Sequence, residues 1–223
     1  MIDLPNNFSL RAMWTRAHRP LATAILCGAT VLSLQGCIEM AIGTAVVGTL
    51  AATDRRTLGA QTEDKEIAIK AETRIPQLVG GAGHVNIASF NRKVLLTGEV
   101  RDDAMKAAVE REVLTISGIA TVVNELVIGA PADYTSRSSD TIITGKVKAS
   151  FVDEKNLYAS SIKVVTERGV VYLMGRVTTR EANLATEIAR GVGGVQKVVR
   201  VFELITDDEL RQLTTSPGAP AAK

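Results

Sequence analysis

One pattern occurs twice in this chain, and this repeat limits the folds that the chain can adopt. Residues 94–100, VLLTGEV, return as residues 171–177, VYLMGRV, 77 positions later. Upstream, DKEIAIKAETRI from Asp64 pairs with DTIITGKVKASF from Asp140, 76 positions later. Four strand positions are identical in the two copies: Val94 and Val171, Leu96 and Leu173, Gly98 and Gly175, and Val100 and Val177. The chain therefore holds two copies of one small module.

Each copy predicts the order helix, strand, strand, helix, strand. Apolar residues recur every four positions in both first helices, which gives each helix one buried face. These residues are Ile67, Ala71 and Ile75 in one copy, and Ile143, Val147 and Phe151 in the other. Asp64 and Asp140 precede these patterns, and we predict them to be the N-caps. The order predicts an α+β fold of two tandem αββαβ modules, each a three-stranded mixed sheet with both helices on one face.

Turn and capping signals support this order. Residues 85–90 and 162–167 alternate as half-buried strands do, and Asn91-Arg92 and Arg168-Gly169 suit the tight hairpin turns that follow them. The second helices are predicted to begin near Asp102-Asp103 and Thr178, where acidic or capping residues cluster. They end before Gly118 and near residues 191–194. Residues 119–128 and 195–205 form the last strands.

The amino-terminal segment reads as an export signal. Residues 1–20 are polar and basic, residues 21–34 are apolar and uncharged, and Leu34-Gln35-Gly36-Cys37 follows. A basic segment, a short apolar core and a small residue before the cut are typical of a secretory signal, whereas a membrane-spanning helix needs about 20 apolar residues. An ordinary signal peptide with an incidental cysteine, or an uncleaved anchor, is the alternative.

The ending Leu-x-Gly-Cys resembles the lipobox of bacterial lipoproteins, although Gln35 replaces the usual small residue. The resemblance implies cleavage before Cys37 and acylation of that cysteine, and Ile38 in the next position favours sorting to the outer membrane. The predicted organisation is a signal peptide (1–36), an acylated tether (37–63), a first module (64–128), a linker (129–139), a second module (140–205) and a largely disordered tail (206–223).

Composition excludes several classes of partner. Without residues 1–36 the chain keeps 23 basic and 23 acidic residues, because that segment holds three of the 26 arginines and lysines and one of the 24 acids. Aromatic residues make up only 4%. A neutral body with few stacking side chains offers no footprint for DNA or RNA. Cys27 and Cys37 are the only cysteines, so the mature body can form no internal disulfide.

The repeated motifs resemble the BON family of bacterial envelope proteins. The residues that carry the match are the VxLxGxV strand, the helix after it, and a Gly-[Ile/Val]-x-x-Val-x-Asn start of the last strand, with Asn124 in the first copy and Arg200 in its place in the second. Two such modules behind a lipobox are similar to dual-BON outer-membrane lipoproteins. The resemblance implies a non-enzymatic, phospholipid-binding protein that faces the periplasm and supports envelope integrity.

The sequence contains no grouping of residues that is typical of a catalytic or metal site. His84 is the sole histidine after residue 36, at the edge of a predicted strand, and a lone histidine is a poor zinc site. The acidic pairs Asp102-Asp103 and Asp207-Asp208 stand where helices begin and are explained as favourable charges at helix N-termini. We predict no catalytic residue, no metal and no cofactor.

A binding surface is predicted on the first helix of the second module. Ile142 lies one position off the buried face, and Lys146 and Lys148 are near it, with Lys155 and Lys163 further along. Apolar insertion beside basic residues suits anionic phospholipid headgroups. A solvated helix with Ile142 covered by the other module or the linker is the alternative.

Two functions from different classes therefore stand. The first is a lipid-anchored protein whose second module contacts anionic phospholipid. The second is an adaptor that binds another envelope protein without recognising lipid, and its mark would be a large exposed apolar patch on a sheet face.

Overall fold

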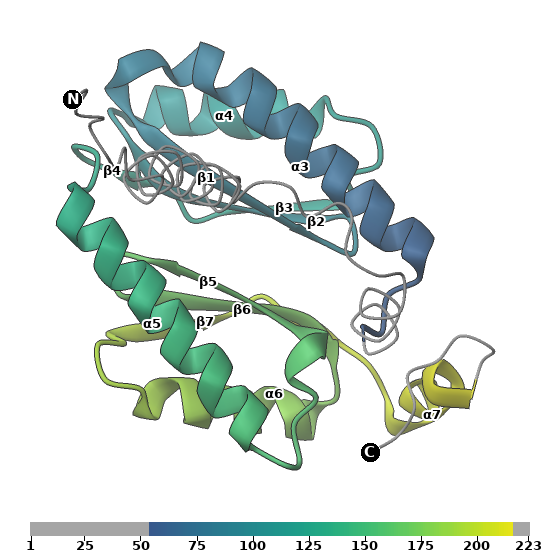
Figure 1. Cartoon of the computed structure of the whole chain (residues 1–223). Helices are drawn as coiled ribbons and strands as arrows, with labels where there is room; N and C mark the ends of the chain where they lie inside the picture. The colour runs from purple at the N-terminus through teal and green to yellow at the C-terminus, as the bar shows by residue number, and fades with distance from the viewer. Residues whose placement is uncertain (1–53, 216–223) are drawn as a thin grey trace, which may run out of the picture. The chain divides into compact units, whose positions relative to one another are not determined.

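The first module consists of two helices and a small sheet. The computed structural model describes residues 54–215. The elements of the first module are α3 (Leu58–Val79), a 3-10 turn (Gly80–Ala82), β1 (His84–Phe90), β2 (Lys93–Val100), α4 (Asp103–Leu114), β3 (Thr121–Asn124) and β4 (Val127–Ile128). Figure 1 shows α3 and α4 on the same face of the sheet. No helix among the described residues has the length and apolar character needed to cross a bilayer.

The second module repeats this order. Its elements are α5 (Tyr134–Asp153), a 3-10 turn (Ala159–Ser161), β5 (Ile162–Glu167), β6 (Val170–Val177), α6 (Thr179–Gly191), β7 (Lys197–Arg200) and β8 (Glu203–Leu204). A further helix, α7 (Asp207–Thr215), follows. Part of the predicted linker is thus the first turn and a half of α5, and part of the tail expected to be disordered is helical.

The two sheets confirm the predicted α+β fold and its mixed strand directions. The central strand of each sheet, β2 or β6, is antiparallel to the strand before it and parallel to the last strands. Each last strand is broken into two pieces, which the sequence pattern did not predict. In the first module Glu125 and Leu126 interrupt the strand, and Leu126 is buried in the core. A break of this kind ends the strict alternation of a strand.

The predicted helix faces are confirmed. Ile67, Ala71 and Ile75 of α3 are buried against the first sheet, and the equivalent residues of α5 are buried against the second. Because i and i+4 lie on one side of a helix, the apolar period places these residues on a single buried stripe. Each module thus has its own core between its sheet and its two helices.

The predicted N-caps of the first helices were wrong. Thr57 caps α3, with its hydroxyl accepting from the amide of Ala60 at 3.1 Å, and Asp133 caps α5. Asp64 and Asp140 lie more than one turn inside these helices, where their carboxylates hold the hairpin turns. The predicted caps of the second helices are confirmed: Asp102 begins α4, and Thr178 begins α6 in a capping box with Glu181.

The helix-free faces of the two sheets pack against each other. Both modules belong to one compact unit of the chain, residues 47–223. A third apolar cluster joins them, with buried residues Ala88, Phe90 and Leu95 from the first sheet and Val165, Tyr172, Met174 and Val201 from the second. Every sheet therefore carries side chains that are buried on both of its faces.

Candidate membrane-contact surface

Helix α5 exposes an apolar strip that is longer than the sequence suggested. Ile142 is 58% exposed, so neither the other module nor the linker covers it. Each helical residue advances by about 100°, which places Gly145, Ala149 and Val152 beside Ile142 on the solvent face. Val152 is 72% exposed, and Tyr134, at the start of the same face, is 85% exposed. Helical periodicity counted outward from Ile142 could have found both of them.

Two exposed lysines border this strip. Lys146 lies about 40° beyond one edge and Lys148 about 40° beyond the other, by the same rotation per residue. Both side chains are exposed, and neither forms an ion pair with any residue that the structure describes. Asp153 ends α5 and Glu154 follows it, whereas Asp140 lies on the buried side of the helix. The structure thus places Ile142, Lys146 and Lys148 on one outward surface.

Lys163 does not belong to this surface. Its ammonium group donates to the backbone oxygen of Ser89 at 3.2 Å, across the contact between the modules. Burial and the neighbouring charge of Arg56 lower the pKa of Lys163. Lys155 is exposed just beyond the end of α5. Alternation along β5 points Lys163 to the face opposite the helices, a signal that the sequence carried.

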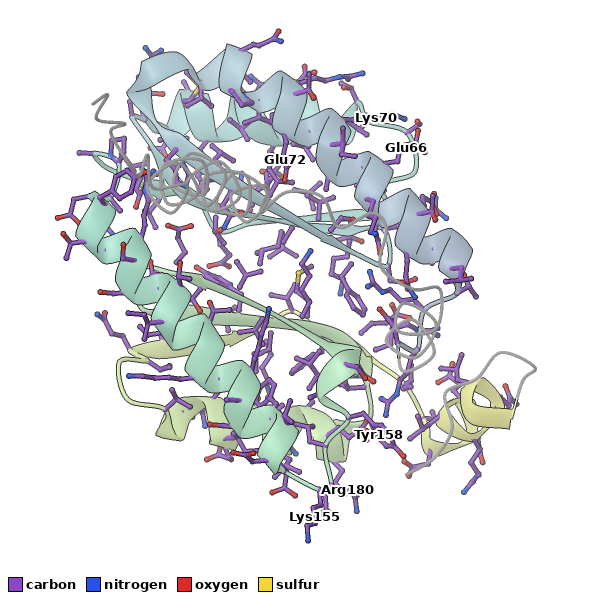
Figure 2. All side chains as sticks on the ribbon, viewed as in Figure 1. Glu66, Lys70, Glu72, Lys155, Tyr158 and Arg180 are labelled. Carbon is purple, nitrogen blue, oxygen red and sulfur yellow. The ribbon has the colours of Figure 1, made fainter. Side chains whose placement is uncertain are left out.

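The matching face of α3 has mixed charge. Positions 76 residues before Ile142, Lys146 and Lys148 are Glu66, Lys70 and Glu72, which Figure 2 labels. Lys70 pairs with Glu66 at 2.6 Å, one turn away. Further along α3, Arg74 pairs with Glu112 of α4 at 3.5 Å. An exposed Ile69 is present, and Lys65 beside it is exposed, but Glu66 and Glu72 bring two acids to the same face.

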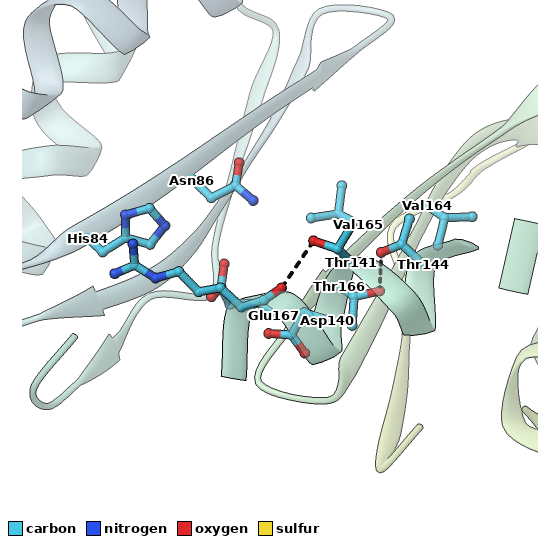
Figure 3. A pocket seen from close by; sticks show the side chains of 10 residues that line it. His84, Asn86, Asp140, Thr141, Thr144, Val164, Val165, Thr166 and Glu167 are labelled. Atoms are coloured by element: carbon cyan, nitrogen blue, oxygen red, sulfur yellow. Dashed lines mark hydrogen bonds between the residues drawn. The ribbon is translucent and has the colours of Figure 1, made fainter. Parts of the chain in front are cut away.

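The pocket around His84 does not form a recognisable reaction centre. This pocket of about 330 Å³ also contains Asn86, Arg137, Asp140 and Glu167 (Figure 3). His84 begins β1, and burial and the charge of Arg137 lower its pKa. Asp140 is occupied by two backbone amides, and no nucleophile is hydrogen-bonded to a base there.

Metal-ligating groups do not gather either. Among residues 54–215, no cluster of three or more histidine, cysteine, aspartate or glutamate side chains could hold a metal ion. The acidic residues noted in the sequence act as predicted: Asp102 caps α4, and Asp207, Asp208 and Glu209 fill the first turn of α7. Negative charges at these positions are favoured by the helix dipole.

Comparison with known proteins assigns the two modules. Residues 63–130 and 139–206 each match the BON domain. The chain belongs to the BON-domain family. It is 35% identical over 184 residues to the outer membrane lipoprotein DolP of Haemophilus influenzae, covering 82% of this chain and 95% of that protein. It is 27% identical to a 21 kDa hemolysin of Actinobacillus pleuropneumoniae, covering 68% of this chain and 79% of that protein.

The relationship bears on the predictions made from the sequence. This BON protein has the tandem arrangement and the outer-membrane location that the sequence predicts, and both are confirmed by its likeness to DolP. Cys37 lies outside the described residues, so its acylation stays a prediction. A type III secretion protein of Chlamydia trachomatis, CdsD, is also similar, with 10% identity and a TM-score of 0.27 over 60% of this chain and 96% of that one.

Proposed function

We propose that this protein is an envelope lipoprotein whose second BON module contacts anionic phospholipid through α5 and thereby supports envelope integrity. The observation that carries the proposal is the exposed apolar strip of α5 with an unpaired lysine along each border. The continuous part of the strip runs from Ile142 to Val152, a length of about 15 Å at 1.5 Å per residue, and Tyr134 lies two turns before it, beyond Ser138. A helix of this kind suits an orientation parallel to the bilayer surface, with its apolar side chains among the headgroups.

The expected affinity is modest, and modest affinity is sufficient. Each lysine near an anionic surface contributes about 1 kcal/mol, and the apolar strip is narrow. Acyl chains on Cys37 would hold the protein at the membrane, so the module would meet lipid at a high effective concentration. Weak contact then suffices to keep α5 on the bilayer.

The alternative function, an adaptor for another envelope protein, is less well supported because no sheet of the two modules has an exposed apolar face. That reading required a large apolar patch on an exposed sheet face. The apolar faces of both sheets are covered, one side by helices and the other by the opposite module. The exposed apolar strip of α5 is instead flanked by basic residues, which favours lipid over a protein partner.

Flotation with vesicles tests the proposal. A chain without residues 1–53 is mixed with vesicles of phosphatidylglycerol or of phosphatidylcholine, and binding is compared for the variants Ile142→Ser and Lys146→Glu. We expect Lys146→Glu to weaken binding to the anionic vesicles by more than about tenfold, because it replaces an attraction with a repulsion. Matched variants on α3, Ile69→Ser and Lys70→Glu, should change binding little.

Two results would contradict the proposal. One is the absence of any binding to phosphatidylglycerol vesicles by the unsubstituted chain. The other is an equal loss of binding from the α3 and α5 variants, since that would remove the distinction between the two modules.

A further inference from the structure

Arg55 lies three residues before α3 of the first module, yet its side chain is buried in the second module. Its guanidinium group donates to both carboxylate oxygens of Glu181, at 2.6 and 2.9 Å, and to the backbone oxygen of Arg176 at 3.0 Å. The ring of Tyr158 lies 5.3 Å from it, within the range of a cation–π contact. The Arg55 side chain is only 3% exposed. All these partners come from the second module.

The next residue, Arg56, turns to the first module. Its guanidinium group stacks 4.1 Å from the ring of Phe90 and pairs with Asp54 and Asp64 at 2.6 and 2.7 Å. Adjacent arginines therefore contact different modules, and the short segment 54–56 spans the contact between them. This segment is also where the predicted tether from Cys37 enters the folded body.

The pairing of Arg55 with Glu181 is built more firmly than a surface ion pair. Glu181 also accepts from the backbone amide of Thr178 at 2.9 Å, so the start of α6 fixes its orientation. Burial alone would raise the pKa of Glu181, but hydrogen bonds from Arg55 and Thr178 lower it overall. Removing one partner of such a pair leaves a buried charge without compensation, which is strongly unfavourable.

We propose that Arg55 and Glu181 form a clasp that fastens the anchored end of the chain to the second module, beside the loop that follows α5. The tether thus enters the body at the module that carries the lipid-facing helix, and the clasp holds the two modules in one orientation. Arg55 is a positioning residue in this arrangement and does not itself contact lipid. Its relevance to membrane binding rests on the proposed function, whereas the clasp itself does not.

Trypsin digestion of the full acylated protein in phosphatidylcholine vesicles tests the clasp. The bonds after Arg55 and Arg56 are trypsin sites, and cleavage at either one separates the tether from the body. Cleavage after Arg56 is the one compared, because the variant Arg55→Gln keeps that site. Trypsin requires local opening of this segment, which the clasp opposes. We expect Glu181→Gln, which keeps the capping box but removes the charge, to speed cleavage there by about tenfold or more. The two products are distinguished by mass, since the body begins at Thr57 after a cut at Arg56 and at Arg56 after a cut at Arg55.

Two further variants complete the test. Glu187→Gln, on the exposed side of α6, removes a carboxylate whose one ion pair within residues 54–215 is with Arg190, and it should leave the cleavage rate unchanged. Arg55→Gln removes the other partner and should speed cleavage after Arg56 as Glu181→Gln does. If Glu181→Gln accelerates cleavage at every site alike, the variant has unfolded and Arg55→Gln decides the question.

The clasp is overturned if neither variant speeds cleavage after Arg56 selectively, or if Glu187→Gln speeds it equally. Repeating the digestion in phosphatidylglycerol vesicles separates this inference from the proposed function. Cleavage reports the clasp in both kinds of vesicle. Retention of the cut body on the anionic vesicles alone reports the lipid contact of α5, and its release from both would contradict that contact without affecting the clasp.

Discussion

Asp64 and Asp140 stand at the same position of the repeat, but the two modules use them unequally. The Asp64 carboxylate accepts from the Ser89 hydroxyl at 2.7 Å and from the amides of Asn91 and Arg92 at 2.6 and 2.8 Å, and it also pairs with Arg56. Within the described part of the chain, Asp140 accepts only from the amides at the equivalent turn, both at 2.8 Å. A carboxylate on the first helix therefore binds the amides of the hairpin turn in both modules, and in the first module it has additional partners.

The composition of the turns explains the difference. Both residues of the first turn, Asn91 and Arg92, have positive φ angles without being glycine, at 50° and 65°. The second turn has Arg168 at 51° and Gly169 at 73°. Because a non-glycine residue in the left-handed region is strained, the first turn needs more support than the second. The extra bonds of Asp64 supply that support.

Removal of the two aspartates should lower the free energy of unfolding by different amounts. We expect Asp64→Ala to lower the free energy of unfolding by about 3–5 kcal/mol, because it leaves two amides and the buried Ser89 hydroxyl without their acceptor, although Arg56 keeps its pair with Asp54. Asp140→Ala should lower it by about 2 kcal/mol. Urea denaturation measures both, with Asp153→Ala at the exposed end of α5 as a control near zero. Equal losses would contradict the unequal roles of the two carboxylates.

The outer faces of α3 and α5 give a second comparison, in which the backbone is the same and the chemistry differs. The first module carries Glu66 and Glu72 where the second carries Ile142 and Lys148. Helix geometry fixes only the inward residues, so the outward ones are free to differ between copies. The proposed lipid contact therefore concerns the second module and not the first.

Exchange of these residues should give the first module the surface of the second. The double variant Glu66→Ile with Glu72→Lys also frees Lys70 from its pair, so it adds one apolar residue and two unpaired lysines to the exposed Ile69 and Lys65 of α3. We expect its binding to phosphatidylglycerol vesicles to rise about tenfold, from the added basic charge and apolar area. Flotation on phosphatidylcholine vesicles is the control for charge. An unchanged affinity would mean that the surface pattern of α5 does not determine lipid contact.

The residues that periodicity governs could be predicted from the sequence. The buried stripes of α3 and α5 follow from helix geometry, and the hairpin turns follow from Asn91 and Gly169, which adopt positive φ more readily than other residues. The capping residues Asp102 and Thr178 were predictable because their partners lie within one turn. In each of these cases the interacting residues are close together in the sequence.

The residues that depend on distant partners could not be predicted. A carboxylate at the start of an apolar pattern reads as an N-cap, yet Asp64 bonds a turn more than 25 positions away, and Arg55 pairs with a residue 126 positions away. One missed feature did have a signal. The consecutive apolar run Val94-Leu95-Leu96 indicates a strand that is buried on both faces, and so predicts the packing of one sheet against the other.

Phe90 and Glu167 precede the two hairpin turns at equivalent positions of the repeat. Both side chains are buried at the contact between the modules, but only Glu167 can carry a charge. Burial raises the pKa of Glu167, and the neighbouring carboxylates of Glu99 and Asp140 raise it further, against hydrogen bonds from Thr97 and Asn86. The ionised form of Glu167 therefore destabilises the contact between the modules.

The pH dependence follows from the sign of this shift. A carboxyl group whose pKa is raised on folding favours the folded state below its ordinary pKa, and this contribution is lost as the pH rises through the raised value. We expect Glu167→Gln to increase the free energy of unfolding by up to about 1 kcal/mol near pH 8, with the gain disappearing near pH 4. Urea denaturation across this range measures it, with the exposed Glu187→Gln as the control. Because other titrating groups are common to both chains, a gain that persists near pH 4 would contradict the role of the Glu167 charge at the contact between the modules.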